Sequence, residues 1–252
     1  MRTFHLTALL LIAITSLTST AVAQNSNSNR KVIEARTLCY ARSADVTQIY
    51  IQGAKKKEVV EIFLPKESIS RRFKCVVQND KAVFYKNGKA GEDGKPEIIP
   101  LAVARVPANQ TKVLFYFIPN KAGSKLPYSV KTFADDYETF PLGYTRVINL
   151  TPTPTRFIIG EHKAVVKEGK MQDFPLVKKK DNFNMGVFRY DQRNKAKQWV
   201  TIRNRTAKYT KGKRLLIIAC YNERLKRPDV RIYKDLPEPK AEAAPAPDPG
   251  PE

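Results

Sequence analysis

The chain has 252 residues and a formal net charge of +21 at neutral pH, from 45 Lys and Arg against 24 Asp and Glu. It contains only two histidines, which disfavours histidine-dependent hydrolases and zinc sites built on several His ligands. The cationic excess favours contact with anionic surfaces or polymers and carries no information about the fold.

The N-terminus has the layout of a secretory signal peptide. Arg2 precedes the apolar stretch Leu6–Leu17, which is followed by the small-residue sequence Ala21-Val22-Ala23. A membrane-spanning helix needs roughly 20 apolar residues, and this stretch is shorter. We therefore predict that residues 1–23 are cleaved and that the product is exported, to the periplasm, the cell surface or the medium. No transmembrane span is expected in the mature chain.

After a polar leader over residues 24–30, short segments rich in Val, Ile, Phe and Tyr alternate with Gly and Asn turns. Strands of this length and spacing are typical of β-sandwich domains, and no segment sustains a helical apolar period. We predict an all-β protein whose first immunoglobulin-like β-sandwich module covers residues 31–135.

A weak internal repeat predicts a second module. The aligned segments are Arg36–Tyr40 with Arg146–Leu150, Lys112–Asn120 with Arg214–Asn222, and Val130–Asp135 with Val230–Asp235. We expect a linker over residues 136–143 and a second immunoglobulin-like β-sandwich module over residues 144–236, in tandem with the first. The acidic run Asp135–Glu138 is interpreted as a solvated turn in preference to a Ca²⁺ site.

Residues 237–252 contain six prolines in sixteen positions and carry a net charge of −3. Proline fixes φ and removes backbone donors, so we expect an extended, polyproline-like, disordered tail without a core. A spacer or a ligand for a partner is the alternative to a purely solvated terminus.

The cysteines are Cys39, Cys75 and Cys220. Export permits disulfides, and an odd count leaves at least one thiol without an intrachain partner. A Cys39–Cys75 bridge is the disulfide candidate that we favour, and three free thiols are the alternative. Cys220 ends the most apolar segment and is interpreted as a small buried hydrophobe.

No catalytic or metal-binding constellation is apparent. The one histidine outside the signal peptide, His162, lies in a sequence typical of a hairpin turn, and no nucleophile elbow or His-Glu-x-x-His motif accompanies it. We predict a non-enzymatic protein with no catalytic residue, no metal ligand and no cofactor.

The segment from Phe188 to Arg214 has ten Lys and Arg and a single acid, with Tyr and Trp interleaved. Strand alternation predicts that Trp199, Thr201, Arg203 and Arg205 share one face. Such a face can bind phosphate or sulfate groups. The alternative is that Trp199 belongs to the core and the lysines maintain solubility. The candidate contact residues are Arg189, Tyr190, Lys197, Trp199, Arg203, Arg205 and Lys208.

These features favour an envelope or cell-surface binding or scaffolding role. Export favours an anionic envelope polymer or an acidic protein as the partner and disfavours nucleic acid. The oligomeric state stays open.

The outline of a signal peptide, two β-sandwiches and high basicity resembles the periplasmic pilus-assembly chaperones. That resemblance implies donation of a strand to a secreted subunit. Leu101–Ile118 has part of the required pattern, although Val113–Ile118 is continuously apolar, as in a buried strand. A hydrolase that uses paired carboxylates is a second alternative.

Overall fold

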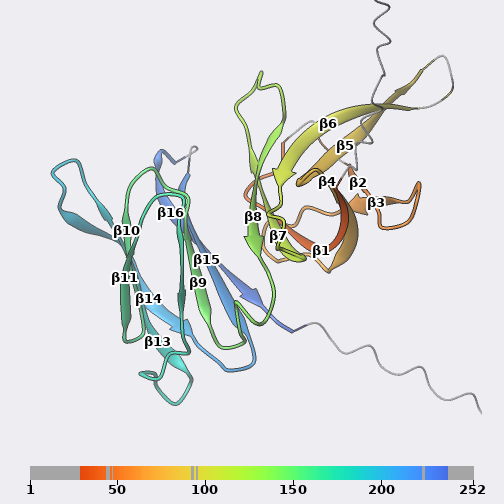
Figure 1. The fold of residues 1–252 in the computed structure, drawn as a ribbon. Helices are drawn as coiled ribbons and strands as arrows, with labels where there is room; N and C mark the ends of the chain where they lie inside the picture. Colours follow the sequence, from red (N-terminus) through yellow and green to blue (C-terminus); the bar gives the residue numbers. More distant parts are fainter. Residues whose placement is uncertain are drawn as a thin grey trace, which may run out of the picture.

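The computed structural model describes residues 29–43, 46, 48–91, 94, 96–222 and 225–237 (Figure 1). The predicted signal peptide, residues 24–28 of the leader and residues 238–252 of the tail lie outside the described residues. The described residues form sixteen strands and no helix, which confirms the all-β prediction. No helical segment among them has the length and apolarity to cross a membrane.

The first half of the described chain forms one eight-stranded sheet. Its strands are β1 (Arg30–Cys39), β2 (Ile49–Gln52), β3 (Val59–Ile62), β4 (Phe73–Gln78), β5 (Lys81–Ala90), β6 (Pro96–Arg105), β7 (Lys112–Pro119) and β8 (Tyr128–Ala134). The order is β3-β2-β5-β4-β1-β7-β8, and β6 pairs with β5 in a long hairpin that extends away from the second half (Figure 1). Because β6 also contacts β8, the sheet curls around a core, in which Phe84 packs edge-to-face on Phe115 and Phe117.

The second half forms two four-stranded sheets with a core between them. Its strands are β9 (Thr145–Asn149), β10 (Thr155–Ile159), β11 (His162–Val166), β12 (Met171–Phe174), β13 (Met185–Arg193), β14 (Trp199–Lys208), β15 (Arg214–Asn222) and β16 (Arg227–Asp235). One sheet has the order β11-β10-β13-β14 and the other β12-β9-β15-β16. Phe157 and Phe188 of the β11-β10-β13-β14 sheet and Val147 and Ile217 of the β12-β9-β15-β16 sheet pack in this core.

Strands β7 and β15 are continuously apolar because both of their faces are buried. In β7, Phe115 faces the core of the first half, whereas Leu114 and Tyr116 face the second half. In β15, Ile217 faces the core of the second half, and Ile218 faces the first. These outward side chains meet in a third core, and full burial of each large apolar side chain stabilises by about 1.5–3 kcal/mol. The two halves are therefore packed against each other along β7 and β15.

The segments that align in the internal repeat form corresponding strand pairs in the two halves. Strand β1 runs parallel to β7 with Arg36 opposite Leu114, and β9 runs parallel to β15 with Arg146 opposite Leu216. Each of β7 and β15 then continues into an antiparallel partner, β8 or β16. The two halves differ in their remaining strands, which close one curled sheet in the first and a pair of sheets in the second.

The predicted Cys39–Cys75 bridge is wrong, and all three cysteines are free and buried. In the β1–β4 ladder Cys75 lies opposite Ile33, so Cys39 is six positions farther along β1. That offset corresponds to about 20 Å along an extended strand, whereas a disulfide joins Cα atoms roughly 4.4–6.8 Å apart. The Cys39 thiol instead donates to the Ala41 carbonyl, at 2.8 Å.

Candidate anion-binding face

The basic segment forms the β13–β14 hairpin, with β14 at the edge of its sheet (Figure 1). A β-bulge interrupts this hairpin, because Tyr190 lies opposite Arg203 whereas the next residue, Asp191, lies opposite Thr201. Ile202 is the extra residue of β14. A one-residue insertion shifts the alternation of the side chains, so residues on the two sides of the bulge face opposite ways.

The prediction that Trp199, Thr201, Arg203 and Arg205 share one face is therefore wrong. Arg203 reaches toward the other sheet, and its Nη2 lies 3.4 Å from Oδ1 of Asp229 on β16. The Arg205 guanidinium lies 5.6 Å from the ring centroid of Phe188, a core residue. Trp199 and Thr201 remain on the outer face of the sheet.

The outer face carries a cluster that consists of Arg156, Arg189, Asp191, Arg193 and Trp199, here termed the outer cluster. Asp191 Oδ2 accepts from Arg156 Nε at 2.7 Å and forms an ion pair with Nη2 at 2.6 Å, while Oδ1 accepts from Arg189 Nε at 2.7 Å. Burial of Asp191 opposes its ionisation, but the bonds from Arg189 and Arg156 outweigh burial and hold its pKa below the usual value. Asp191 is therefore an anion that orients two arginines.

Trp199 lies against two cations of the outer cluster. The guanidinium carbons of Arg156 and Arg193 are 4.8 Å and 5.0 Å from its ring centroid, which is the range of a cation–π contact. The indole is half-buried and is not part of the core, so the alternative in which Trp199 is a core residue is wrong. Because arginines already occupy the ring, its role here is to hold guanidinium groups.

The outer cluster has a surplus of positive charge. It contains three guanidinium groups and one carboxylate: Arg156 and Arg189 pair with Asp191, and Arg193 lies against Trp199. The pairing register adds two further cations to the same face of the sheet. Lys163 lies opposite the outward residue Ile158, and Lys208 lies opposite Met185. Among the described residues, the ion pairs of Arg156 and Arg189 involve one acid, Asp191. The arrangement can therefore accept phosphate, sulfate or carboxylate groups.

The predicted contact residues lie at different places in the structure, and only some of them belong to the outer cluster. Tyr190 is fully buried and stacks on Phe157 with ring centroids 5.3 Å apart, so its predicted contact role is wrong. Lys197 is exposed in the β13–β14 turn, and Lys208 is exposed at the end of β14. Of the predicted set, Arg189 and Trp199 belong to the outer cluster. Arg156 was missed, because it lies on β10 and only the cross-strand register brings it to Asp191.

A second group of charges lies between the two halves. This buried charge cluster consists of Arg36 on β1, Arg214 on β15, Asp135 after β8 and Asp235 at the end of β16. Arg36 donates to Asp135 at 2.6 Å and to Asp235 at 2.7 Å. Arg214 donates to Asp235 at 2.7 Å and to Asp135 at 2.9 Å. These two cations and two anions supply one charge of each sign from each half, and Arg72, which is partly exposed, adds a third guanidinium at 3.2 Å from Asp135.

The buried charge cluster cannot supply the acid and base of a hydrolase. All four carboxylate oxygens of Asp135 and Asp235 accept from or pair with guanidinium groups, including Arg72 at 3.2 Å from Asp135. Burial opposes ionisation of Asp235, but the bonds from Arg36 and Arg214 outweigh burial and hold its pKa below the usual value. Asp235 therefore stays ionised, and every carboxylate oxygen of the two acids is engaged by a guanidinium group.

The acidic run Asp135–Glu138 lies only partly in this interface: Asp135 is buried, whereas Tyr137 and Glu138 are exposed, as expected for a solvated turn. Arg214 donates to the backbone carbonyl of Phe140 at 3.0 Å. The Phe140 ring lies under two guanidinium groups, 4.3 Å from that of Arg146 and 4.7 Å from that of Arg214. Within the described residues, no group of three or more His, Cys, Asp or Glu side chains could hold a metal ion.

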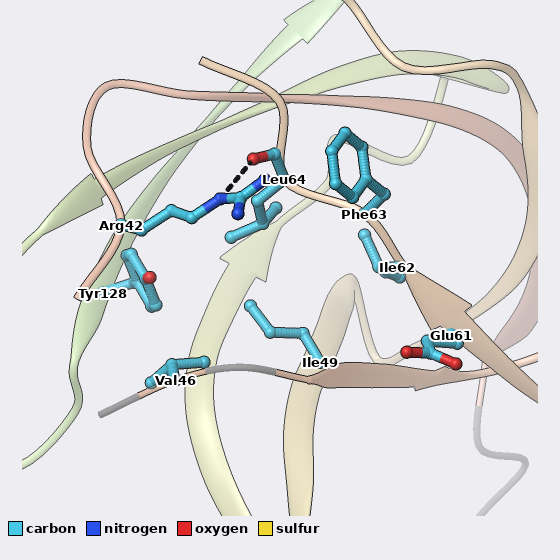
Figure 2. A pocket seen from close by; sticks show the side chains of 8 residues that line it. All are labelled: Arg42, Val46, Ile49, Glu61, Ile62, Phe63, Leu64 and Tyr128. Carbon is cyan, nitrogen blue, oxygen red and sulfur yellow. Dashed lines mark hydrogen bonds between the residues drawn. The ribbon is translucent and has the colours of Figure 1, made fainter. Parts of the chain in front are cut away.

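A pocket of about 320 Å³ opens at one end of the first half (Figure 2). Figure 2 shows Ile49, Ile62 and Leu64 along its wall and Arg42 at its rim. The Arg42 Nε donates to the Leu64 carbonyl at 3.1 Å, and its guanidinium lies 5.0 Å from the Phe63 ring. Because its one cation is accompanied by one carboxylate, that of Glu61, this pocket lacks the positive surplus of the outer cluster.

No family model matches the chain, and no curated protein matches it significantly.

Proposed function

We propose that this is an exported, non-enzymatic binding or scaffolding protein of the cell envelope or cell surface, which contacts an anionic partner through the outer cluster. The observation that carries the proposal is the ratio of three guanidinium groups to one carboxylate on the outer face of the β11-β10-β13-β14 sheet. The signal-peptide pattern supports export, and export supports an envelope polymer or an acidic protein as the partner.

The cluster is preorganised for anion binding. A guanidinium has five N–H donors, and Asp191 engages Nε and Nη2 of Arg156 and only Nε of Arg189. The remaining donors face an outward surface whose shape is held by Asp191 and Trp199. Arginines that are already fixed lose less conformational entropy on binding than free side chains do. The cluster therefore favours planar or tetrahedral oxyanions.

The same proposal includes two tandem immunoglobulin-like β-sandwich modules, with a boundary in residues 136–143. The equal register of β1 with β7 and of β9 with β15 supports it. The two sheets around one core in the second half support a sandwich there. In the first half a single curled sheet encloses the core, and the sandwich assignment rests on the alignment with the second.

Strand donation is less well supported than surface binding. The apolar segment that resembles a donor strand includes β7, and β7 is hydrogen-bonded to β1 on one side and to β8 on the other. It has no free edge to offer unless one of those partners leaves.

The experiment is retention of the mature chain on a dextran sulfate resin, eluted with a salt gradient. The double variant Arg189→Gln/Arg193→Gln is expected to elute at clearly lower salt than the unaltered chain. The control Lys55→Gln/Lys56→Gln removes the same charge from an exposed turn of the first half and is expected to elute close to the unaltered chain. Equal elution of both variants would show that net charge, and not the outer cluster, governs retention.

A further inference from the structure

A groove with a volume of about 840 Å³ lies between the two halves. Its walls hold three tyrosines, Tyr40 after β1, Tyr116 on β7 and Tyr221 on β15, and two cations, Lys121 and Arg231. Among the described residues that line it, none is acidic. This groove does not overlap with the outer cluster, and its lining comes from strands of both halves.

The groove presents the ring of Tyr221, which is exposed, and that of Tyr40, which is half-buried. The Arg231 guanidinium lies over the Tyr40 ring at 4.2 Å, and Tyr221 is 38% exposed. Tyr116 is fully buried, and its hydroxyl, close to that of Tyr233, has no hydrogen-bond partner of normal distance and angle in the described residues. Burial raises the pKa of the Cys220 thiol to about 11, so the thiol is uncharged at neutral pH. The two charged groups among the described lining residues, Lys121 and Arg231, are both cations.

We propose that this groove is the docking site of the chain's own proline-rich segment, residues 238–252. That segment holds five prolines in fifteen residues, four of them at every second position from Pro245 to Pro251. Proline-rich segments in polyproline II conformation dock into aromatic-lined grooves, because their shape is preformed and little entropy is lost on binding. Tyr40 and Tyr221, the tyrosines of the groove with exposed surface, are the matching aromatic groups.

The charges of the groove and the segment are complementary. Residues 238–252 contain four acids and one lysine. Asp248 and Glu252 flank the last two prolines of the segment, and Lys121 and Arg231 are the cations of the groove. The cations of the groove therefore select an acidic proline-rich segment over a neutral or basic one.

The length of the segment is sufficient. Arg231 lies four residues before Asp235 on β16, which corresponds to about 13 Å along the strand. Fifteen residues in polyproline II conformation span about 46 Å. The segment can therefore turn back beside β16 and still place its last prolines in the groove of the same molecule.

The test uses the full mature chain with the photoreactive residue p-benzoylphenylalanine in place of Ala246, between two of the prolines. After irradiation, mass spectrometry of an equal mixture of ¹⁴N- and ¹⁵N-labelled protein identifies the crosslinked peptides. We expect crosslinks within one molecule to residues 116–121 or 220–222. Crosslinks elsewhere, crosslinks between differently labelled molecules, or none at all would overturn the proposal.

Two variants separate docking from chance proximity. Tyr221→Ala removes an exposed wall of the groove and is expected to reduce the intramolecular crosslink at least fivefold. Tyr137→Ala is the matched control, because Tyr137 is 39% exposed and lies in the linker, outside the groove. An equal yield from both variants would contradict a role for the groove, whereas dextran sulfate retention is expected to be unchanged in either.

Discussion

The buried charge cluster and the outer cluster are made of the same two groups, guanidinium and carboxylate, in different ratios. Between the halves, Arg36 and Arg214 are matched by Asp135 and Asp235, and all four side chains are buried. On the outer face, Arg156 and Arg189 pair with Asp191, which is the one carboxylate of the outer cluster, and Arg193 adds a third guanidinium through its contact with Trp199.

Contacts between arginine and carboxylate therefore have different consequences in the interior and at the surface. A balanced, desolvated cluster holds elements together because each charge would be very costly to leave unpaired in the interior. An unbalanced cluster at the surface keeps its arginines in place with one carboxylate and presents the surplus charge to solvent. We interpret the first as cohesive and the second as the recognition surface.

The largest loss of stability is expected when one charge is removed from the buried charge cluster. Asp235→Asn leaves Arg36 and Arg214 with one anion between them, and breaking a buried ion pair in this way costs about 3–5 kcal/mol. We expect a loss of this size in the free energy of unfolding from urea titration. Asp229→Asn is the control, since the Arg203–Asp229 pair is partly exposed and 3.4 Å long, and we expect a change below about 1 kcal/mol. Similar losses in the two variants would contradict the cohesive role.

Removing the carboxylate of the outer cluster is expected to have a smaller effect on stability. Asp191→Asn loses its charge-assisted bonds to Arg156 and Arg189, which costs about 1–3 kcal/mol. It also increases the positive surplus of the face, so retention on dextran sulfate is expected to stay equal or rise. A variant that keeps its stability but loses retention would show that Asp191 itself contacts the ligand.

The smallest expected effect is a dependence on pH. Asp191 and Asp235 each have a folded-state pKa below the usual value, because the bonds from arginines outweigh burial. Glu161 is similar, since the backbone N–H groups of Lys178 and Lys179 outweigh its slight desolvation and lower its pKa to about 2.

A carboxylate with a lowered folded pKa stabilises the protein above the unfolded pKa, near 4 for Asp and Glu, and this stabilisation is lost as the pH falls through the folded value. The urea midpoint is therefore expected to fall as the pH is lowered from about 4 toward 2. Asp191→Asn lacks one of these groups and is expected to lose less over the same interval. Parallel curves for the variant and the unaltered chain would contradict this assignment.

Much of the fold could be predicted from local sequence. Short runs of Val, Ile, Phe and Tyr between turn residues predict strands, and the unbroken apolar run of β7 predicts a strand without a solvent-facing side. The burial of Tyr190 could also have been predicted, because Tyr190 is two residues from Phe188 in one strand and both side chains face the core.

The errors share a physical cause, which is that strand register is not encoded locally. The insertion of Ile202 in β14 separates Trp199 from Arg203, and no residue type in that strand marks a bulge. The offset of Cys39 from Cys75 follows from the β1–β4 ladder alone. Likewise, the alignment showed that each half closes on an aspartate, but only the packing of β7 against β15 brings Asp135 and Asp235 together.

The most direct test of the outer cluster as the contact face uses Trp199, the one tryptophan of the chain. Because its ring lies against Arg156 and Arg193, an anion that engages these guanidinium groups changes the emission of the indole. We predict a saturable change in tryptophan fluorescence on titration with dextran sulfate, which persists in Lys55→Gln/Lys56→Gln and is lost in Arg189→Gln/Arg193→Gln. Binding of dextran sulfate without any change in tryptophan emission would contradict the account.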